Sequence, residues 1–182
     1  LFRSRSIIIM LHNGLGVLDE IASQLPALRI ISGITTMGAH LKKPFNIHTS
    51  LEGHYVLGPG LGSFSNMEIS KVCASFQKAE LPHQWDPEIQ TKIWGKFAVN
   101  CCINMLTALL DCKNGDLMAH QHLLKRLAKE VSLVVSSNDI HISPNDLFQM
   151  TLQIIERTAE NYSSMVHDMR KGQQTEIKYL NQ

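Results

Sequence analysis

The sequence predicts two regions of different architecture, an α/β region over residues 1–86 and an all-helical region over residues 87–182. Three observations predict this division. Strand-like apolar runs alternate with a helical segment near the start, as in a doubly wound α/β sheet. From Glu88 onward, apolar residues recur at helical spacing, without strand candidates of comparable strength. Between the two patterns, the segment from Leu81 to Pro87 interrupts both.

The α/β region begins with a strand, a helix and a second strand. Residues 7–11 are apolar on both faces, which is typical of a parallel sheet that is covered on both sides. Residues 17–25 carry one apolar helical face that ends before Pro26, and residues 28–35 form the second strand-like run. This order predicts a βαβ unit.

The rest of the α/β region predicts an antiparallel edge followed by a helix. Residues 45–50 and 54–57 indicate two short strands in a hairpin, and the glycine-rich residues 58–62 end the second one. Apolar residues at helical spacing then predict a helix over residues 66–78. The glycines of 58–62 do not have the spacing G-x-G-x-x-G and no helix follows at once, so they do not indicate a phosphate-binding turn.

The helical region predicts three long helices. The first covers about residues 87–110 and the second about residues 115–138. The third begins at Ser143, a good N-cap, with Pro144 in the first turn, and continues as one apolar stripe until Lys171 and Gly172.

Composition excludes several classes of function. The formal net charge is +1 and no long runs of like charge occur, so the sequence predicts no nucleic-acid partner and no anionic membrane surface as a partner. No apolar run approaches the roughly 20 residues of a membrane span, and no signal sequence is evident. The expected compartment is the cytoplasm, with small molecules as partners.

The cysteines indicate neither disulfides nor a metal site. Four occur, at Cys73, Cys101, Cys102 and Cys112. They show no C-x-x-C pairing, and Cys112 with His120 and His122 lacks a recognised ligand spacing. We therefore expect no metal.

The most informative segment is an apolar helix that carries one polar row. Lys96, Asn100 and Asn104 recur every fourth residue and therefore share one narrow face, whereas most neighbouring positions are apolar. This row is either a solvated face or the wall of a polar cleft. Solvated faces usually carry several Glu and Lys residues, so the cleft is favoured.

Two further segments carry polar residues in unusual places. Asn161, Ser163 and Ser164 are weak helix formers inside the predicted third helix; from the residues alone exposure on a polar face is favoured, with a function as the alternative. Asn13 lies in a turn at the end of the first strand, where open α/β sheets bind ligands, although an Asn-Gly pair is also simply a good turn.

Four segments together resemble, in order and spacing, the signatures of the ketopantoate reductase family. They are residues 12–16, 96–108, 114–117 and 160–165. The similarity extends through essentially the whole chain. It implies a partial Rossmann-type dinucleotide-binding domain over residues 1–86, followed by a helical substrate and catalytic domain over 87–182 that is similar to the C-terminal domain of 6-phosphogluconate dehydrogenase.

The resemblance also implies an activity, the NADPH-dependent reduction of 2-dehydropantoate to (R)-pantoate in pantothenate and coenzyme A biosynthesis. Lys96 matches the catalytic lysine, which protonates the carbonyl oxygen as hydride reaches the carbon. Burial of a lysine lowers its pKa and makes it a better acid. Glu176 matches an acidic residue near this lysine and the nicotinamide ribose.

The other implied roles are binding roles. The substrate-binding residues, besides Lys96, are Asn13, Asn100, Asn104, Asn114, Asn161, Ser163 and Ser164. The cofactor contacts are Asn13, Glu176 and the main chain of Ala39. The implied partner is a small keto acid, and the implied assembly is a monomer or a homodimer.

The family pattern also includes segments that residues 1–182 do not contain. A glycine-rich turn precedes the first strand in the family and binds the pyrophosphate, and a closing helix follows the last segment. We therefore expect residues 1–182 alone to bind NADPH weakly or not at all. The alternatives are a related dehydrogenase of another 2-keto acid, and a truncated, non-catalytic fragment of the same fold.

Overall fold

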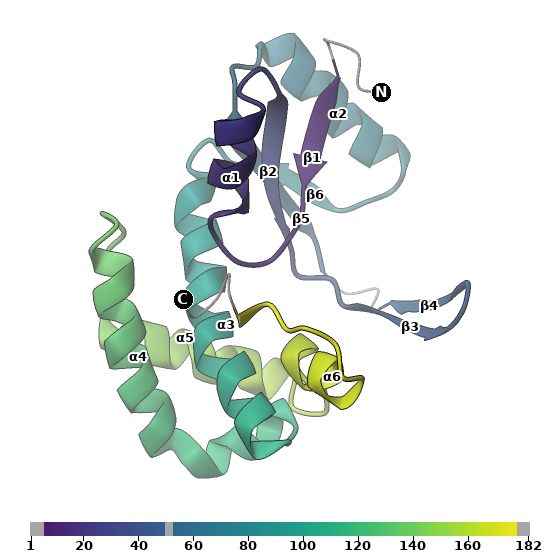
Figure 1. Ribbon diagram of the computed structural model, residues 1–182. Helices are drawn as coiled ribbons and strands as arrows, with labels where there is room; N and C mark the ends of the chain where they lie inside the picture. The colour runs from purple at the N-terminus through teal and green to yellow at the C-terminus, as the bar shows by residue number, and fades with distance from the viewer. Residues whose placement is uncertain (1–5, 50–52, 178–182) are drawn as a thin grey trace. The chain divides into compact units, whose positions relative to one another are not determined.

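The computed structural model describes residues 6–49 and 53–177 of the chain. The residues cluster into two compact units, one that ends at Lys92 and one that begins at Ile93, and we describe each unit separately. Figure 1 shows a mixed α/β arrangement in the first unit and helices in the second. This confirms the predicted fold class. The assignment of residues 1–86 and 87–182 to a cofactor domain and a substrate domain stays a prediction.

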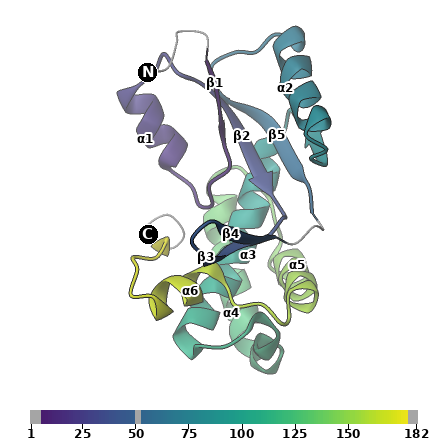
Figure 2. The ribbon, with the colours of Figure 1, turned by 90° about the vertical axis from the view of Figure 1, so that its right-hand side faces the viewer.

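A four-stranded sheet forms the centre of the first unit. Its strands are arranged in the order β1 (Ile7–Met10), β2 (Arg29–Thr35), β5 (Tyr55–Leu61) and β6 (His83–Trp85). Strands β1 and β2 are parallel and are joined through helix α1 (Val17–Gln24), which confirms the βαβ unit. Helices α1 and α2 (Asn66–Lys78) lie on opposite sides of the sheet (Figure 2).

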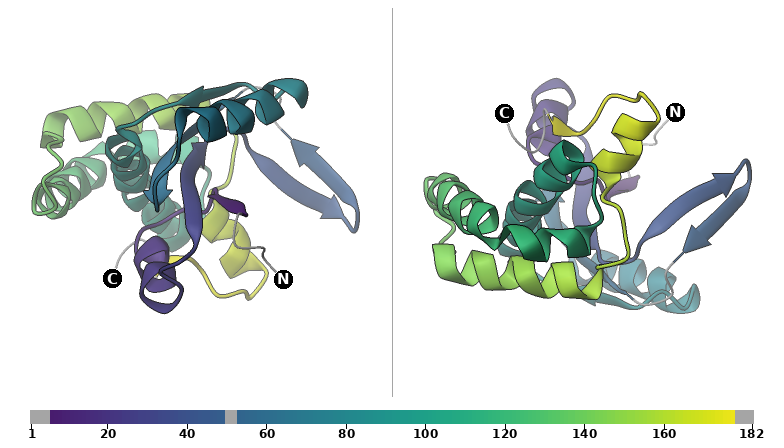
Figure 3. Two further views of the ribbon diagram at one scale, coloured as in Figure 1. Left: turned by 90° about the horizontal axis from the view of Figure 1, so that it is seen from above. Right: turned by 90° about the horizontal axis from the view of Figure 1, so that it is seen from below.

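The two strands predicted to form a hairpin, residues 45–50 and 54–57, do not pair with each other. Strand β4 (Asn46–Thr49) pairs with β3 (Ala39–Lys43) as a separate two-stranded ribbon (Figure 3), and β3 was not predicted. Strand β5 pairs instead with β2, antiparallel, and with β6, parallel. The apolar residues Val56 and Leu57 are buried in this central strand, so the main sheet offers them more burial than a short ribbon. Most of the predicted turn, residues 51–53, lies outside the described residues.

Strand β6 was also missed, because it has only three residues and prolines flank it. Strand β5 does not end at the glycine run but continues through it to Leu61. Close packing explains two of these glycines. A Cβ at Gly58 would lie 2.2 Å from the Asp86 carbonyl oxygen, and a Cβ at Gly60 would lie 2.6 Å from Ser32 Oγ. The glycines therefore serve close strand packing, not phosphate binding.

We expect Gly58→Ala to destabilise the first unit by about 1–3 kcal/mol, because the added methyl meets backbone that must shift. The measurement is the free energy of unfolding from urea denaturation. Gly95→Ala is the matched control, since a Cβ there meets only Met150 Cε at 3.6 Å and alanine favours the helix. Equal stability of the Gly58 variant and the wild type would contradict the packing argument.

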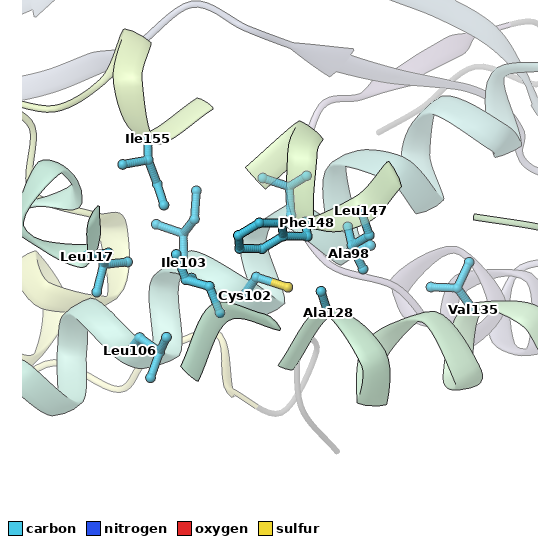
Figure 4. Packing of buried hydrophobic residues seen from close by; sticks show 12 residues of the cluster. Ala98, Cys102, Ile103, Leu106, Leu117, Ala128, Val135, Leu147, Phe148 and Ile155 are labelled. Carbon is cyan, nitrogen blue, oxygen red and sulfur yellow. The ribbon is translucent and has the colours of Figure 1, made fainter. Parts of the chain in front are cut away.

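The second unit is built around helix α3 (Ile89–Leu110), whose first turn belongs to the first unit. It continues through the 3₁₀ segment η1 (Asn114–His120) and the helices α4 (Gln121–Ser136), α5 (Pro144–Arg157) and α6 (Ser164–Arg170). Helices α4 and α5 lie side by side (Figure 3). Side chains from α3, η1, α4 and α5 form one buried apolar cluster (Figure 4), which includes Ala98, Cys102, Ile103, Leu106, Leu117, Leu124, Ala128, Val135, Leu147, Phe148 and Ile155.

Two of the predicted helices have different limits. The second begins as a 3₁₀ segment, and the third is two helices, α5 and α6, with a break over residues 158–163. At this break the Ala159 and Asn161 carbonyls accept hydrogen bonds from the backbone N–H groups of Gly115 and Asn114. The break carbonyls thus bond to η1 and not to the next helical turn. The predicted start was confirmed, since Ser143 caps α5 through the Asp146 N–H and Pro144 occupies the first turn.

Helix α3 corrects the expectation that no apolar run approaches the length of a membrane span. It has 22 residues and a window of mean hydropathy 1.4, which suffices for a span by length and composition. However, 56% of that window is buried within the protein, and the core helix of a soluble protein meets the same criterion. The helix is therefore weak evidence for a membrane.

Candidate functional site

The polar row on α3 is partly buried along its length. Lys96 and Asn100 are half-buried, and Asn104 has an exposed fraction of 7%. The neighbouring residues Ala98, Val99 and Cys101 are buried apolar residues. A fully solvated face does not account for such a row, because buried carboxamides and amines need hydrogen-bond partners.

Lys96 experiences two opposing electrostatic effects. Burial is the larger effect and lowers the pKa of its ammonium group, whereas the carboxylate of Glu176 raises that pKa. The Glu176 Oε2 atom is itself buried and has no hydrogen-bond partner among the described residues. The structure therefore brings together the two predicted catalytic residues, a lysine made more acidic by burial and a carboxylate that favours its protonated form.

The start of α6 lies against the far end of the polar row. Asn104 Nδ2 donates a hydrogen bond of 3.5 Å to Ser164 Oγ, so two predicted substrate-binding residues from α3 and α6 are in contact. Ser163 caps α6, because its Oγ accepts from the Val166 N–H at 3.3 Å. The prediction that these serines lie in the middle of the third helix was wrong, because they stand at the start of α6, where serine is favoured.

Asn114 and Asn161 lie at the same break, and the Asn114 N–H donates to the Asn161 carbonyl at 2.9 Å. The Asn114 side chain is buried, with Nδ2 donating to Thr158 Oγ1 at 2.9 Å. Its Oδ1 atom has no hydrogen-bond partner among the described residues, and the Asn161 side chain is exposed. An unsatisfied amide oxygen is a candidate acceptor for a ligand or a water molecule.

Several contacts that the sequence did not predict lie at the break and at α6. Arg170 pairs with Asp111 at 2.8 Å and its guanidinium lies 4.0 Å from the centre of the Tyr162 ring. Lys113 pairs with Glu160 at 2.7 Å. These partners are 47 and 59 residues apart in sequence, so no local pattern indicates them.

Thr107 was missed as well, although the sequence holds a signal for it. It is a hydroxyl residue three positions after Asn104, in a segment that is otherwise apolar. Its exposed fraction is 0%, and its hydroxyl lies 2.8 Å from that of Ser163.

Asn13 and Ala39 belong to the first unit. Asn13 is half-buried in the turn that follows β1, and Ala39 is the exposed first residue of β3. Gly14 and Gly16 in this turn have φ angles of 84° and 88°, which glycine adopts without strain. A Cβ at Gly16 would meet nothing within 4 Å, so the turn leaves room for a ligand to approach its main chain. Such room beside the main chain is what a cofactor bound at this turn would need.

Thiol and metal chemistry find no support in the described residues. Burial raises the pKa of Cys101 to about 12 and that of Cys102 to about 11, so neither thiol is a nucleophile near neutral pH. Within residues 6–49 and 53–177, no three His, Cys, Asp or Glu side chains are grouped as metal ligands.

Comparison with known proteins gives the family. Residues 88–182 match the model described as "Ketopantoate reductase PanE/ApbA C terminal", and residues 1–62 match the model "Ketopantoate reductase PanE/ApbA". The chain belongs to the ketopantoate reductase family. This membership confirms the resemblance that the four sequence segments indicated.

Curated members of the ketopantoate reductase family are similar along almost the whole chain. The 2-dehydropantoate 2-reductase of Shigella flexneri is 35% identical over 179 residues, which cover 96% of this chain and 56% of that protein. The enzyme of Vibrio cholerae is 34% identical over 181 residues, 96% of this chain and 59% of that protein. The chain thus spans a little over half the length of these relatives.

Solved structures agree on the fold. The D-mandelate dehydrogenase solved with NADH and anilino(oxo)acetate superposes with a TM-score of 0.88 at 24% identity, covering 100% of this chain and 60% of that one. The 2-dehydropantoate 2-reductase from Geobacter metallireducens gives a TM-score of 0.85 at 24% identity, covering 99% and 61%. At these identities the likeness shows the fold alone.

Proposed function

We propose that this chain is the catalytic part of a ketopantoate reductase that reduces 2-dehydropantoate to (R)-pantoate with NADPH. The observation that carries the proposal is the half-buried Lys96 beside Glu176, in a chain 35% identical over 96% of its length to a 2-dehydropantoate 2-reductase. The proposal places the enzyme in the cytoplasm, in pantothenate and coenzyme A biosynthesis. A homodimer is compatible with it, as the ketopantoate reductase from Staphylococcus aureus is described as dimeric.

The reaction needs one hydride and one proton. When bound, the reduced nicotinamide supplies the hydride to the keto carbon, and Asn13, Glu176 and the main chain of Ala39 are the residues that would hold it. The Lys96 ammonium donates the proton to the carbonyl oxygen, which becomes the hydroxyl of the product. Burial makes this ammonium a stronger acid, and Glu176 keeps it protonated before the reaction.

The uncharged polar groups orient the substrate. Asn100 and Asn104 continue the row from Lys96 along α3, and Ser164 contacts Asn104. The same binding role is proposed for three residues around the break before α6: Asn114, Asn161 and Ser163. Amides and hydroxyls bind a carboxylate without adding negative charge that would repel it.

The test is a steady-state assay of the full-length protein, in which NADPH oxidation depends on added ketopantoate. A panel of other 2-keto acids, with benzoylformate as the keto acid of the mandelate reaction, tests the alternative of a related dehydrogenase. We expect the highest kcat/KM with ketopantoate, and a lower value with NADH than with NADPH. A higher kcat/KM with another keto acid would overturn the substrate, and no turnover with any of them would favour a non-catalytic protein.

Ser164→Ala is expected to raise KM for ketopantoate by about tenfold, while kcat changes less. The reason is that a hydroxyl that only binds substrate contributes equally to ground state and transition state, and one hydrogen bond is worth about this factor. Ser137→Ala is the control, because Ser137 Oγ donates to the Val134 carbonyl and accepts from Asn138 Nδ2 at the exposed end of α4. A fall in kcat at constant KM would contradict the binding role of Ser164.

A further inference from the structure

Thr107 connects the polar row on α3 to the first residues of α6. Its side chain is fully buried, and its Oγ1 atom lies 2.8 Å from Ser163 Oγ. Ser163 is also buried, with an exposed fraction of 6%, and caps α6. Ser164 follows directly and accepts a hydrogen bond from Asn104, three residues before Thr107.

One arrangement of the two hydroxyl protons gives each of them an acceptor. Thr107 has one hydroxyl proton, and its possible acceptors are the Ile103 carbonyl at 2.9 Å, the Asn104 carbonyl at 3.1 Å and Ser163 Oγ. When Thr107 donates to Ile103, Ser163 donates to Thr107 and its own oxygen still accepts from the Val166 N–H. Both hydroxyl protons then have an acceptor. If the Thr107 hydroxyl is removed, the proton of the buried Ser163 hydroxyl loses its acceptor.

Buried apolar side chains also pack at this end, Met165 and Val166 of α6 with Cys101 and Ala108 of α3, whereas the ion pair of α6 lies at its other end. The pair of Arg170 and Asp111 lies at the last residue of α6, and both side chains are largely exposed, with 42% and 68% of their surface accessible. Exposed ion pairs contribute little to holding a geometry. The hydroxyl pair is therefore the buried polar contact that joins α3 to the start of α6.

We propose that Thr107 is a positioning residue of the reductase, which sets the distance between Ser164 and Asn104 by holding the Ser163 cap. This inference rests on the proposed function. Thr107 itself makes no contact with the substrate. Its hydroxyl acts through Ser163, so that Ser164 Oγ and the Asn104 amide stay placed to bind the substrate together.

The test replaces Thr107 with valine, which keeps the shape and removes the hydroxyl, in the full-length enzyme. We expect Thr107→Val to raise KM for ketopantoate by about tenfold with kcat within about threefold, because substrate contacts are misplaced while the acid is not. Thr107→Ser should restore KM. Thr151→Val is the control, since Thr151 is as deeply buried and its hydroxyl bonds to the Leu147 carbonyl of α5 and to the Cys102 thiol of α3, not to α6. It should lower the melting temperature and leave KM unchanged.

Two further measurements keep the proposal testable. Thr107→Val combined with Ser163→Ala should raise KM no more than the larger of the single effects, because both remove one contact. Hydrogen exchange of the Val166 amide should be faster in Thr107→Val than in Thr151→Val, and this comparison needs no activity. If the wild type does not reduce ketopantoate, the proposed function fails and amide exchange alone decides the positioning role. Equal KM and equal exchange in the two valine variants would overturn the inference.

Discussion

Lys96→Ala is expected to lower kcat for ketopantoate reduction by about 10²–10⁴, the usual cost of removing a positioned general acid. The fold should persist. Burial opposes the charge of this lysine, so its ammonium group does not support stability. The measurements are ketopantoate-dependent NADPH oxidation and thermal unfolding on one preparation of the full-length enzyme.

Lys92→Ala is the matched control for this variant. Lys92 lies one turn earlier on the same row of α3, and its Nζ atom pairs with Asp86 Oδ2 at 2.9 Å on a partly exposed surface. Its loss should leave kcat nearly unchanged. A Lys96 variant with wild-type kcat would disprove the acid role, and one with a low melting temperature but normal turnover would show a structural lysine.

Glu176→Gln is expected to move the alkaline limb of the kcat profile to lower pH. The Glu176 carboxylate raises the pKa of Lys96, so its removal leaves burial unopposed and lowers that pKa further. Reduction requires the protonated lysine and is lost as pH rises through its pKa. At a pH between the alkaline limbs of the variant and the wild type, kcat of the variant should therefore be lower than that of the wild type. The largest difference is the factor of about 10²–10⁴ that the loss of a general acid costs.

The measurement is kcat as a function of pH with saturating ketopantoate and NADPH. Glu160→Gln is the control, since Glu160 pairs with Lys113 on the surface and should leave the profile in place. An alkaline limb at the same pH in wild type and Glu176→Gln would show that the carboxylate does not act on the lysine. A shift to higher pH would contradict the sign of the effect.

Sequence alone predicted the features that neighbouring residues determine. Helix α2 was predicted with its observed ends, and the structure shows why, because Ser65 and Glu68 cap each other's backbone groups within one turn. The start of α5 was predicted from Ser143 and Pro144 for the same reason. The alignment of Lys96, Asn100 and Asn104 follows from the helical period itself.

The tertiary structure decided what depends on distant partners. Strand β5 had several possible partners, and it pairs with β2 and β6 because the central sheet buries Val56 and Leu57. The break before α6 depends on Asn114 and Gly115, which bond to carbonyls more than 40 residues later. The roles proposed for Thr107 and Glu176 also rest on contacts with residues far away in sequence. Hydrophobic period and capping act over a few residues, whereas the choice of a buried partner depends on which surfaces the folded chain brings together.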